Sequence, residues 1–356
     1  MWNRRRMLMG GLGLLAATLL PARSGCAEGE KKTELVILTW SDYLDPDVVK
    51  AFEARHPVTV RQVFFDSDQA RDQQVMRKGS DAFDIMVVNA INLASYAHQN
   101  WLTPLDKGRL ANFAQLDPLW LAEAESQGKL LGLPYFWGDI GLAYREDLMP
   151  AAPTSWMDFF RPAEPLRGHL GAIATNRELV GLALKALGHS VNTEDPAHLA
   201  EAETLLMQQK PYVTSYPYID ISQESPLVTG AVKLAIVYNG DALKLREFDP
   251  RIRYVNPGEG SIKWVDFLAM GTNTARREVT HAFLDFLNDP AMASRNAGFL
   301  HFATPNRGAL AMADPGYLAD PVIFPPEEVL RKSETIRPVA PRTQRKINEI
   351  MARLQR

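Results

Sequence analysis

Short apolar runs alternate with amphipathic segments along this chain, and no other feature of the sequence restricts the fold as strongly. Residues 35–38 form a continuous apolar run of the kind found in buried parallel strands. Asp45 and Pro46 then supply an N-cap and a first-turn proline for a helix, which His56 and Pro57 end. Strands that alternate with helices predict an α/β architecture with mainly parallel sheets.

Further units of this kind follow along the chain. We predict strands over residues 58–65, 83–88, 170–174 and 234–238, and helices over residues 69–78, 193–209, 274–288 and 342–354. A chain of 356 residues is too long for one small core and suits two domains of ordinary size. The last helix has an apolar face, and we expect it to pack on its own domain.

The N-terminus predicts export. Three arginines at residues 4–6 precede an apolar stretch over residues 7–20, and small residues follow up to Ala27. This order is typical of a secretory signal peptide over residues 1–27, and its apolar core is short for a membrane span. Two alternatives remain open, namely export by the twin-arginine pathway and lipid anchoring at Cys26. In each case we predict an exported protein, placed in a bacterial periplasm.

Charge and motifs exclude several classes of function. The formal net charge is −3, but residues 1–27 hold four arginines and no acid, which leaves 35 basic and 42 acidic residues in the rest of the chain. This balance, without a basic run interleaved with aromatic residues, predicts no nucleic-acid binding. The single cysteine excludes a cysteine zinc site, and no nucleophile elbow, phosphate loop or zinc-protease motif occurs. We therefore predict no catalytic residue, no metal and no cofactor.

Aromatic and acidic residues gather where the predicted strands end. In open parallel sheets, the ligand crevice lies beyond the carboxyl ends of the strands. The residues placed there are Trp40, Ser41, Asp42, Tyr43, Asn89, Glu178, Tyr238 and Asp241, together with Trp264 and Asp266, which share one side of an extended segment. Few basic residues accompany them, and a helical start directs Arg177 away from Glu178.

Such a set of residues favours a small organic cation. An aromatic face attracts an ammonium group by about 0.5–2 kcal/mol, and a charged hydrogen bond to a carboxylate adds roughly 1.5–3 kcal/mol. Two or three contacts of each kind reach the about 8 kcal/mol that micromolar binding needs. Any one of the tryptophans taken alone is more often a core residue than a site residue, so it is their joint placement at strand ends that favours a binding site.

A series of motifs now carries a family resemblance. Trp40 to Tyr43 read WSDY, and the segments that follow in order are PYFWG at 134–138, NGD at 239–241, WVDFLAM at 264–270 and TPN at 304–306. This series resembles the periplasmic spermidine/putrescine-binding proteins that serve ABC transporters. The resemblance implies the type II periplasmic-binding-protein fold, a monomer of two α/β lobes joined by hinge strands. Lobe one would comprise residues 34–140 plus 264–310, and lobe two residues 141–263 plus 311–356.

The resemblance also implies roles for individual residues. Trp40 and Trp264 would sandwich the methylene chain of the ligand, while Asp266 and Glu178 would hold its amino groups. Asp42 and Asp241 match acids of putrescine-selective members, and Ser41 and Tyr43 match polar contacts near one amine. The two remaining candidates keep an aromatic ring where the family uses a different one: Tyr238 in place of tryptophan and Phe302 in place of tyrosine.

This chain departs from the family pattern at several positions. Asn89 replaces a serine, Ile91 an aromatic residue and Thr175 an acid, and Arg337 falls near a glutamine that contacts polyamines in the family. The loss of an acid and the possible gain of a guanidinium disfavour a long trication. We predict a short diamine such as putrescine, or an amine with an acidic end, ahead of spermidine.

Three functions remain open from the sequence. The first is a transport receptor that delivers an amine to an ABC permease. The second is a sensor subunit of the same fold that docks on a membrane signalling protein. The third is an enzyme, which is disfavoured because carboxylates without a nucleophile, metal or cofactor support little chemistry beyond acid–base steps.

Overall fold

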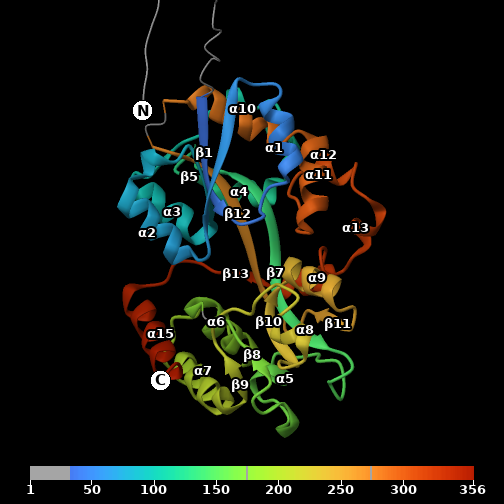
Figure 1. The fold of residues 1–356 in the computed structure, drawn as a ribbon. Helices are drawn as coiled ribbons and strands as arrows, with labels where there is room; N and C mark the ends of the chain where they lie inside the picture. Colours follow the sequence, from blue (N-terminus) through green and yellow to red (C-terminus); the bar gives the residue numbers. More distant parts are fainter. Residues whose placement is uncertain (1–32, 174, 273–274) are drawn as a thin grey trace, which may run out of the picture.

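The computed structural model describes residues 33–173, 175–272 and 275–356. The predicted signal peptide and Cys26 lie outside the described residues. Figure 1 shows two lobes, one above the other, with two long strands running from one into the other. Among the described residues, none of the helices combines the length and the apolar composition needed to cross a bilayer.

The first lobe is built on three parallel strands. β1 (Thr33–Trp40) lies between β2 (Val58–Phe65) and β3 (Ile85–Asn89), parallel to both. The helices of this lobe include α1 (Pro46–Glu53), α2 (Asp68–Lys78), α3 (Ala90–His98), α10 (Arg277–Leu287) and α11 (Pro290–Leu300). The predicted helix start is confirmed, because the Asp45 side chain accepts a hydrogen bond from the backbone N–H of Asp47 and Pro46 begins α1.

Two long antiparallel strands connect the lobes. β7 (Leu133–Arg145) pairs with β12 (Ile262–Gly271), and the register places Trp264 opposite Gly138. The resulting strand order is β2-β1-β3-β12-β7-β10-β8-β9. The sheet is therefore mixed, and the expectation of mainly parallel sheets was wrong. The sheet is mixed because the two strands that connect the lobes run antiparallel to their neighbours: β12 is antiparallel to β3, and β7 is antiparallel to β10.

The second lobe repeats the arrangement of the first. β8 (Leu170–Gly171) lies between β10 (Leu234–Tyr238) and β9 (Val213–Ser215), parallel to both. Its longer helices are α6 (Asn176–Ala186), α7 (Pro196–Gln209), α9 (Asn239–Phe248) and α15 (Pro341–Leu354). Apart from short 3-10 turns, the other helices and strands of the described residues, in both lobes, are α4 (Pro118–Ala124), α5 (Met157–Phe160), α8 (Pro226–Thr229), α12 (Arg307–Leu310), α13 (Pro315–Ala319), α14 (Glu327–Lys332), β4 (Leu102–Thr103), β5 (Glu125–Ser126), β6 (Lys129–Leu130), β11 (Ile252–Val255) and β13 (Glu334–Thr335).

The buried apolar residues of the described ranges form one large core in the first lobe, a second core in the second lobe, and a smaller third cluster around β10. The first core contains the buried residues of β1 and β3, and the second contains those of α6 and the apolar face of α15. The last helix thus packs on the second lobe, whereas Tyr317, Val322 and Ile323 belong to the first core. The segment after residue 310, which the sequence assigned as a whole to the second lobe, therefore contributes to both cores. The lobe boundaries themselves stay a prediction.

Candidate functional site

Several residues predicted from the sequence lie at strand ends. Trp40 is the last residue of β1, and Asn89 is the last residue of β3 and caps α3 with its side chain. Tyr238 ends β10, and Asp241 lies in the first turn of α9. Glu178 lies in the first turn of α6, which follows β8. Since parallel strands bring their carboxyl ends to one edge, each lobe presents these side chains from a single edge of its sheet.

In the first lobe, a tyrosine and a carboxylate form a pair. The hydroxyl of Tyr43 donates a 3.0 Å hydrogen bond to Oδ2 of Asp266. Burial raises the pKa of Asp266, and hydrogen bonds from Tyr43 and Trp40 partly oppose this rise. The Tyr43 main chain is fixed in turn, because its carbonyl oxygen accepts a 2.9 Å hydrogen bond from the hydroxyl of Tyr135. These contacts join the turn after β1 to β12 through Asp266 and to β7 through Tyr135.

In the second lobe, two further tyrosines hold two further acids. The hydroxyl of Tyr238 lies 3.0 Å from each carboxylate oxygen of Glu178. The hydroxyl of Tyr218 donates a 2.6 Å hydrogen bond to Oδ2 of Asp241 and accepts a 3.1 Å hydrogen bond from the backbone N–H of Tyr238. Tyr218 therefore ties the two tyrosine–acid pairs of this lobe together.

Two aromatic rings, those of Phe302 and Trp264, connect the Tyr43–Asp266 pair of the first lobe with the Tyr238–Glu178 pair of the second. The ring of Phe302 lies 6.0 Å from that of Tyr43 and 5.0 Å from that of Trp264, which in turn lies 6.1 Å from Tyr238. The contacts of Trp264 with Phe302 and Tyr238 are edge-to-face, the favoured geometry for aromatic pairs. A Cβ at Gly240 would fall on the Phe302 ring, so glycine is what lets this ring lie over the start of α9.

Burial makes the acids of the site weak. Desolvation raises the pKa of Glu178 and of Asp266 to about 7 and that of Asp241 to about 6, against the opposing effect of their tyrosine partners. The negative charge of Asp68 raises the pKa of Glu178 and Asp266 further. A cation placed among these carboxylates would favour their ionised forms. The site is therefore suited to a positively charged ligand.

Three other residues predicted for the site, Ser41, Asp42 and Asn89, are not members of the tyrosine–acid pairs. Ser41 and Asp42 are exposed in the turn that follows β1, where Asp42 has a φ of 53°. The Asn89 side chain is engaged within the protein, since its Oδ1 accepts a 3.0 Å hydrogen bond from the backbone of Asn92 and its Nδ2 donates a 2.6 Å hydrogen bond to Asp68. Direct contact of these residues with a ligand stays a prediction.

The two arginines considered near the site both contact Asn192. Nη2 of Arg177 lies 3.3 Å from Oδ1 of Asn192, to which the backbone N–H of Arg337 also donates a 2.8 Å hydrogen bond. Burial lowers the pKa of Arg177. The orientation of Arg177 relative to Glu178 stays a prediction.

Sequence reasoning missed two residues of this group, Asp68 and Tyr218. Asp68 opens α2, separated by two residues from the end of β2, so the rule of strand ends that selected the other candidates also applies to it. Tyr218 precedes β10 in an irregular segment, and nothing in its sequence context announces its hydrogen bond to Asp241.

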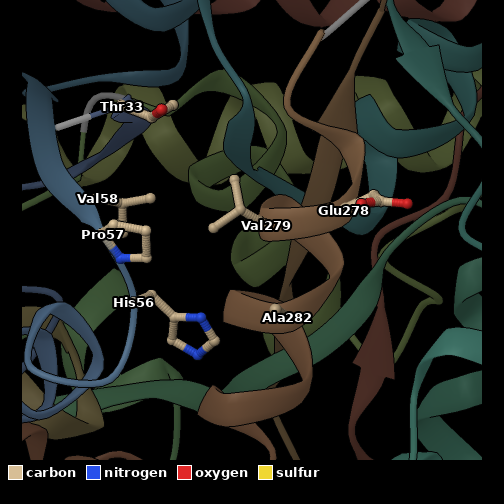
Figure 2. A pocket seen from close by; sticks show the side chains of 7 residues that line it. All are labelled: Thr33, His56, Pro57, Val58, Glu278, Val279 and Ala282. Atoms are coloured by element: carbon tan, nitrogen blue, oxygen red, sulfur yellow. The ribbon is translucent and has the colours of Figure 1, made fainter. Parts of the chain in front are cut away.

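A separate pocket of about 350 Å³ lies at the opposite end of β1 (Figure 2). Its lining residues are Thr33, His56, Pro57, Val58, Glu278, Val279 and Ala282. Thr33 begins β1 and Trp40 ends it, and a strand of eight residues spans about 23 Å. In Figure 2 the carboxylate of Glu278 points away from the apolar side chains. The pocket is therefore distinct from the cluster of acids and rings.

The described ranges offer no alternative metal centre. Within them, no group of three or more histidine, cysteine, aspartate or glutamate side chains is arranged to hold a metal ion. The carboxylates of the site are engaged with tyrosine hydroxyls instead.

Comparison with known proteins relates this chain to binding proteins. Residues 47–325 match the family model of the bacterial extracellular solute-binding proteins. The chain is 27% identical over 322 residues to the spermidine/putrescine-binding periplasmic protein of Escherichia coli K12, which covers 90% of this chain and 91% of the relative. It is 31% identical over 299 residues to the norspermidine sensor of Vibrio cholerae, with 83% of this chain and 82% of the relative covered.

Solved structures agree with these relatives. The spermidine/putrescine ABC transporter substrate-binding protein of Streptococcus pneumoniae superposes with a TM-score of 0.81 at 25% identity, and the match covers 91% of this chain and 98% of that structure. The predicted two-lobed periplasmic-binding-protein fold and the predicted family resemblance are thereby confirmed. The chain belongs to the family of bacterial extracellular solute-binding proteins.

Proposed function

We propose that this protein is a periplasmic receptor for a short diamine such as putrescine and that it delivers this ligand to an ABC permease. The observation that carries the proposal is that each lobe contributes a tyrosine–carboxylate pair, Tyr43 with Asp266 in the first and Tyr238 with Glu178 in the second. Aromatic rings, among them Trp264, connect the two pairs. The relatives named above as polyamine-binding proteins support the same ligand class.

Two separated acidic pairs suit a ligand with one positive charge at each end. Each ammonium group would gain charged hydrogen bonds from one pair, and the methylene chain between them would lie against the rings. The position that carries an acid in the family carries Thr175 here, which is exposed. A third amine of spermidine would lack that acid, and this favours the dication.

We infer that binding rather than catalysis is the role of these carboxylates. They are paired with tyrosine hydroxyls, and the relatives reported above are named as binding or sensor proteins. The apolar and arginine-rich N-terminus, together with the periplasmic relative, supports export to the periplasm. Cell fractionation of the full-length protein tests the location.

A sensor role is the second candidate. The observation that favours it is the 31% identity to the norspermidine sensor of Vibrio cholerae over most of both chains. In that case the same amine site would control docking on a membrane signalling protein. Uptake of labelled putrescine separates the two roles: a deletion strain that loses uptake supports transport, while unchanged uptake supports sensing.

Isothermal titration calorimetry tests the ligand assignment. We expect micromolar or tighter binding of putrescine, weaker binding of spermidine, and a loss of about 10- to 100-fold in putrescine affinity in Trp264→Ala and in Asp266→Ala. 4-Aminobutyrate tests the variant with one acidic end. Tight binding of spermidine without a signal for putrescine would overturn the diamine preference, and unchanged affinity in both variants would overturn the site.

A further inference from the structure

Tyr218 connects two predicted residues of the candidate site without being one of them. It lies in the irregular segment between β9 and α8. Its hydroxyl donates a 2.6 Å hydrogen bond to Oδ2 of Asp241 and accepts a 3.1 Å hydrogen bond from the backbone N–H of Tyr238, whose ring lies 5.4 Å from its own. The hydroxyl thus joins the end of β10 to the first turn of α9.

Chemistry fixes the direction of these two hydrogen bonds. A backbone N–H can only donate, so the Tyr218 oxygen must accept the hydrogen bond from Tyr238. A hydroxyl carries a single hydrogen, which is therefore directed to Oδ2 of Asp241. A donated hydrogen bond stabilises the ionised form of a carboxyl group. Burial raises the pKa of Asp241, and the hydrogen bond from Tyr218 opposes this rise.

The position of Asp241 places this carboxylate beside the aromatic rings of the site. Asp241 directly follows Gly240, where an added Cβ would meet the ring of Phe302, and that ring lies 5.0 Å from the ring of Trp264. Within the described residues, the Tyr218 hydroxyl is the one group that donates a hydrogen bond to the Asp241 carboxylate. Oδ1 of Asp241 is therefore left for a ligand.

We propose that Tyr218 is a positioning residue of the amine site, which holds the Asp241 carboxylate in place and ionised so that Oδ1 accepts a hydrogen bond from an ammonium group of the ligand. This inference rests on the proposed function, because it presupposes an amine ligand. The Tyr43–Asp266 and Tyr238–Glu178 pairs keep their assigned ends of the diamine, and Asp241 adds a further acceptor from the second lobe. Tyr218 acts through Asp241 and does not itself contact the ligand.

Isothermal titration calorimetry with putrescine tests this role in Tyr218→Phe, which removes only the hydroxyl group. We expect putrescine affinity to fall about threefold at pH 8 and about tenfold or more at pH 6. The loss is larger at pH 6 because, without the hydrogen bond, a larger fraction of Asp241 is protonated there. Glu178 and Asp266 titrate in both proteins, so their effect cancels in the ratio of the two affinities.

The matched control is Tyr212→Phe, which removes a 2.8 Å hydrogen bond to Glu164 on the surface of the same lobe. Its affinity for putrescine should stay within about twofold of the parent at both pH values. A double-mutant cycle then separates positioning from packing. In the Asp241→Asn background, where residue 241 carries no charge, the further change Tyr218→Phe should alter affinity less than about twofold.

A loss in Tyr218→Phe that is equal at pH 6 and pH 8, or that persists in the Asp241→Asn background, would show a general structural effect and overturn the inference, as would an unchanged affinity. If Tyr218→Phe does not fold, Asp241→Glu decides the question, because it keeps the charge but moves the carboxylate by one methylene group relative to Tyr218. Putrescine affinity should then fall about tenfold, and an unchanged affinity contradicts the inference. A parent protein that binds no amine contradicts the proposed function itself.

Discussion

Asp139 is a buried carboxyl group on the strand that connects the lobes. The hydroxyl of Tyr254 donates a 2.7 Å hydrogen bond to its Oδ1, while no residue of the described ranges reaches its Oδ2. Burial raises the pKa of Asp139 to about 7. The free aspartate ionises near pH 4. Folding therefore becomes less favourable as the pH rises from about 4 to about 7, because the native state holds a proton that the unfolded chain releases.

Asp139→Asn should consequently stabilise the protein at pH 8. Each unit of pKa difference corresponds to about 1.4 kcal/mol. The buried amide of the new asparagine would lack some hydrogen-bond partners, which reduces the benefit. We therefore expect a gain of about 2 kcal/mol at pH 8 that disappears near pH 4. Urea unfolding at both pH values measures it. Asp249→Asn is the control of opposite sign: Arg251 lowers the pKa of Asp249 to about 2, so this variant should be less stable at pH 8. A gain for Asp139→Asn that is equal at both pH values would contradict the account.

At the scale of elements, the sequence predicted those helices and strands that local patterns specify and missed a strand that pairing with distant segments specifies. The strands over residues 58–65 and 234–238 coincide with β2 and β10, and the helix after Asp45 begins where its cap and proline place it. β7 was not predicted, because Pro134, Gly138 and Asp139 interrupt its apolar pattern. Its extended form is fixed instead by pairing with β12, β10 and β11, which lie far away in the sequence.

The pairing of β7 with β12 depends on the small size of Gly138, which lies opposite Trp264. A Cβ at this position would lie 2.7 Å from Cζ2 of Trp264 and closer still to Oδ1 of Asn239. Gly138→Ala should therefore cost about 1–3 kcal/mol of stability and weaken amine binding, because the indole must move. Thermal unfolding and calorimetry measure the two effects.

Gly298→Ala provides the matched control for that substitution. Gly298 lies within α11, and a Cβ there would meet no atom within 4 Å. Alanine should raise stability by about 0.5–1 kcal/mol through its helix propensity, without a change in amine affinity. If Gly138→Ala and Gly298→Ala had the same effect on thermal stability and amine affinity, the close contact between Gly138 and Trp264 would not limit the size of residue 138.

At the scale of the whole molecule, the sequence predicted which residues lie at strand ends better than how those residues interact. The strand-end rule places Trp40, Tyr238 and Asp241 from local patterns alone, and it would also have found Asp68. The hydrogen bond from Tyr43 to Asp266 joins positions 223 residues apart. No local pattern encodes such a pair, because it forms only when β12 returns from the second lobe to lie beside β3.

The buried acids of both lobes predict that the stability of the empty protein falls with rising pH, whereas the stabilisation by a bound diamine increases with rising pH. Because the pKa values of Glu178 and Asp266 are raised to about 7 and that of Asp241 to about 6, the empty native state retains protons that the unfolded chain has lost above pH 4. The stability contributed by these groups falls between about pH 4 and pH 7. A diamine, which stays doubly charged over this range, binds the ionised carboxylates.

We therefore expect the rise in melting temperature caused by saturating putrescine to be larger at pH 8 than at pH 5. At pH 5 the site acids hold protons that an ammonium group must displace, whereas at pH 8 they are ionised and repel one another until the ligand arrives. Differential scanning fluorimetry at several pH values measures the shift. Glu178→Gln removes one of the titrating groups, so its ligand-induced shift should depend less steeply on pH than that of the parent. A shift that is the same at pH 5 and pH 8, or larger at pH 5, would mean that these carboxylates do not receive the charge of the ligand.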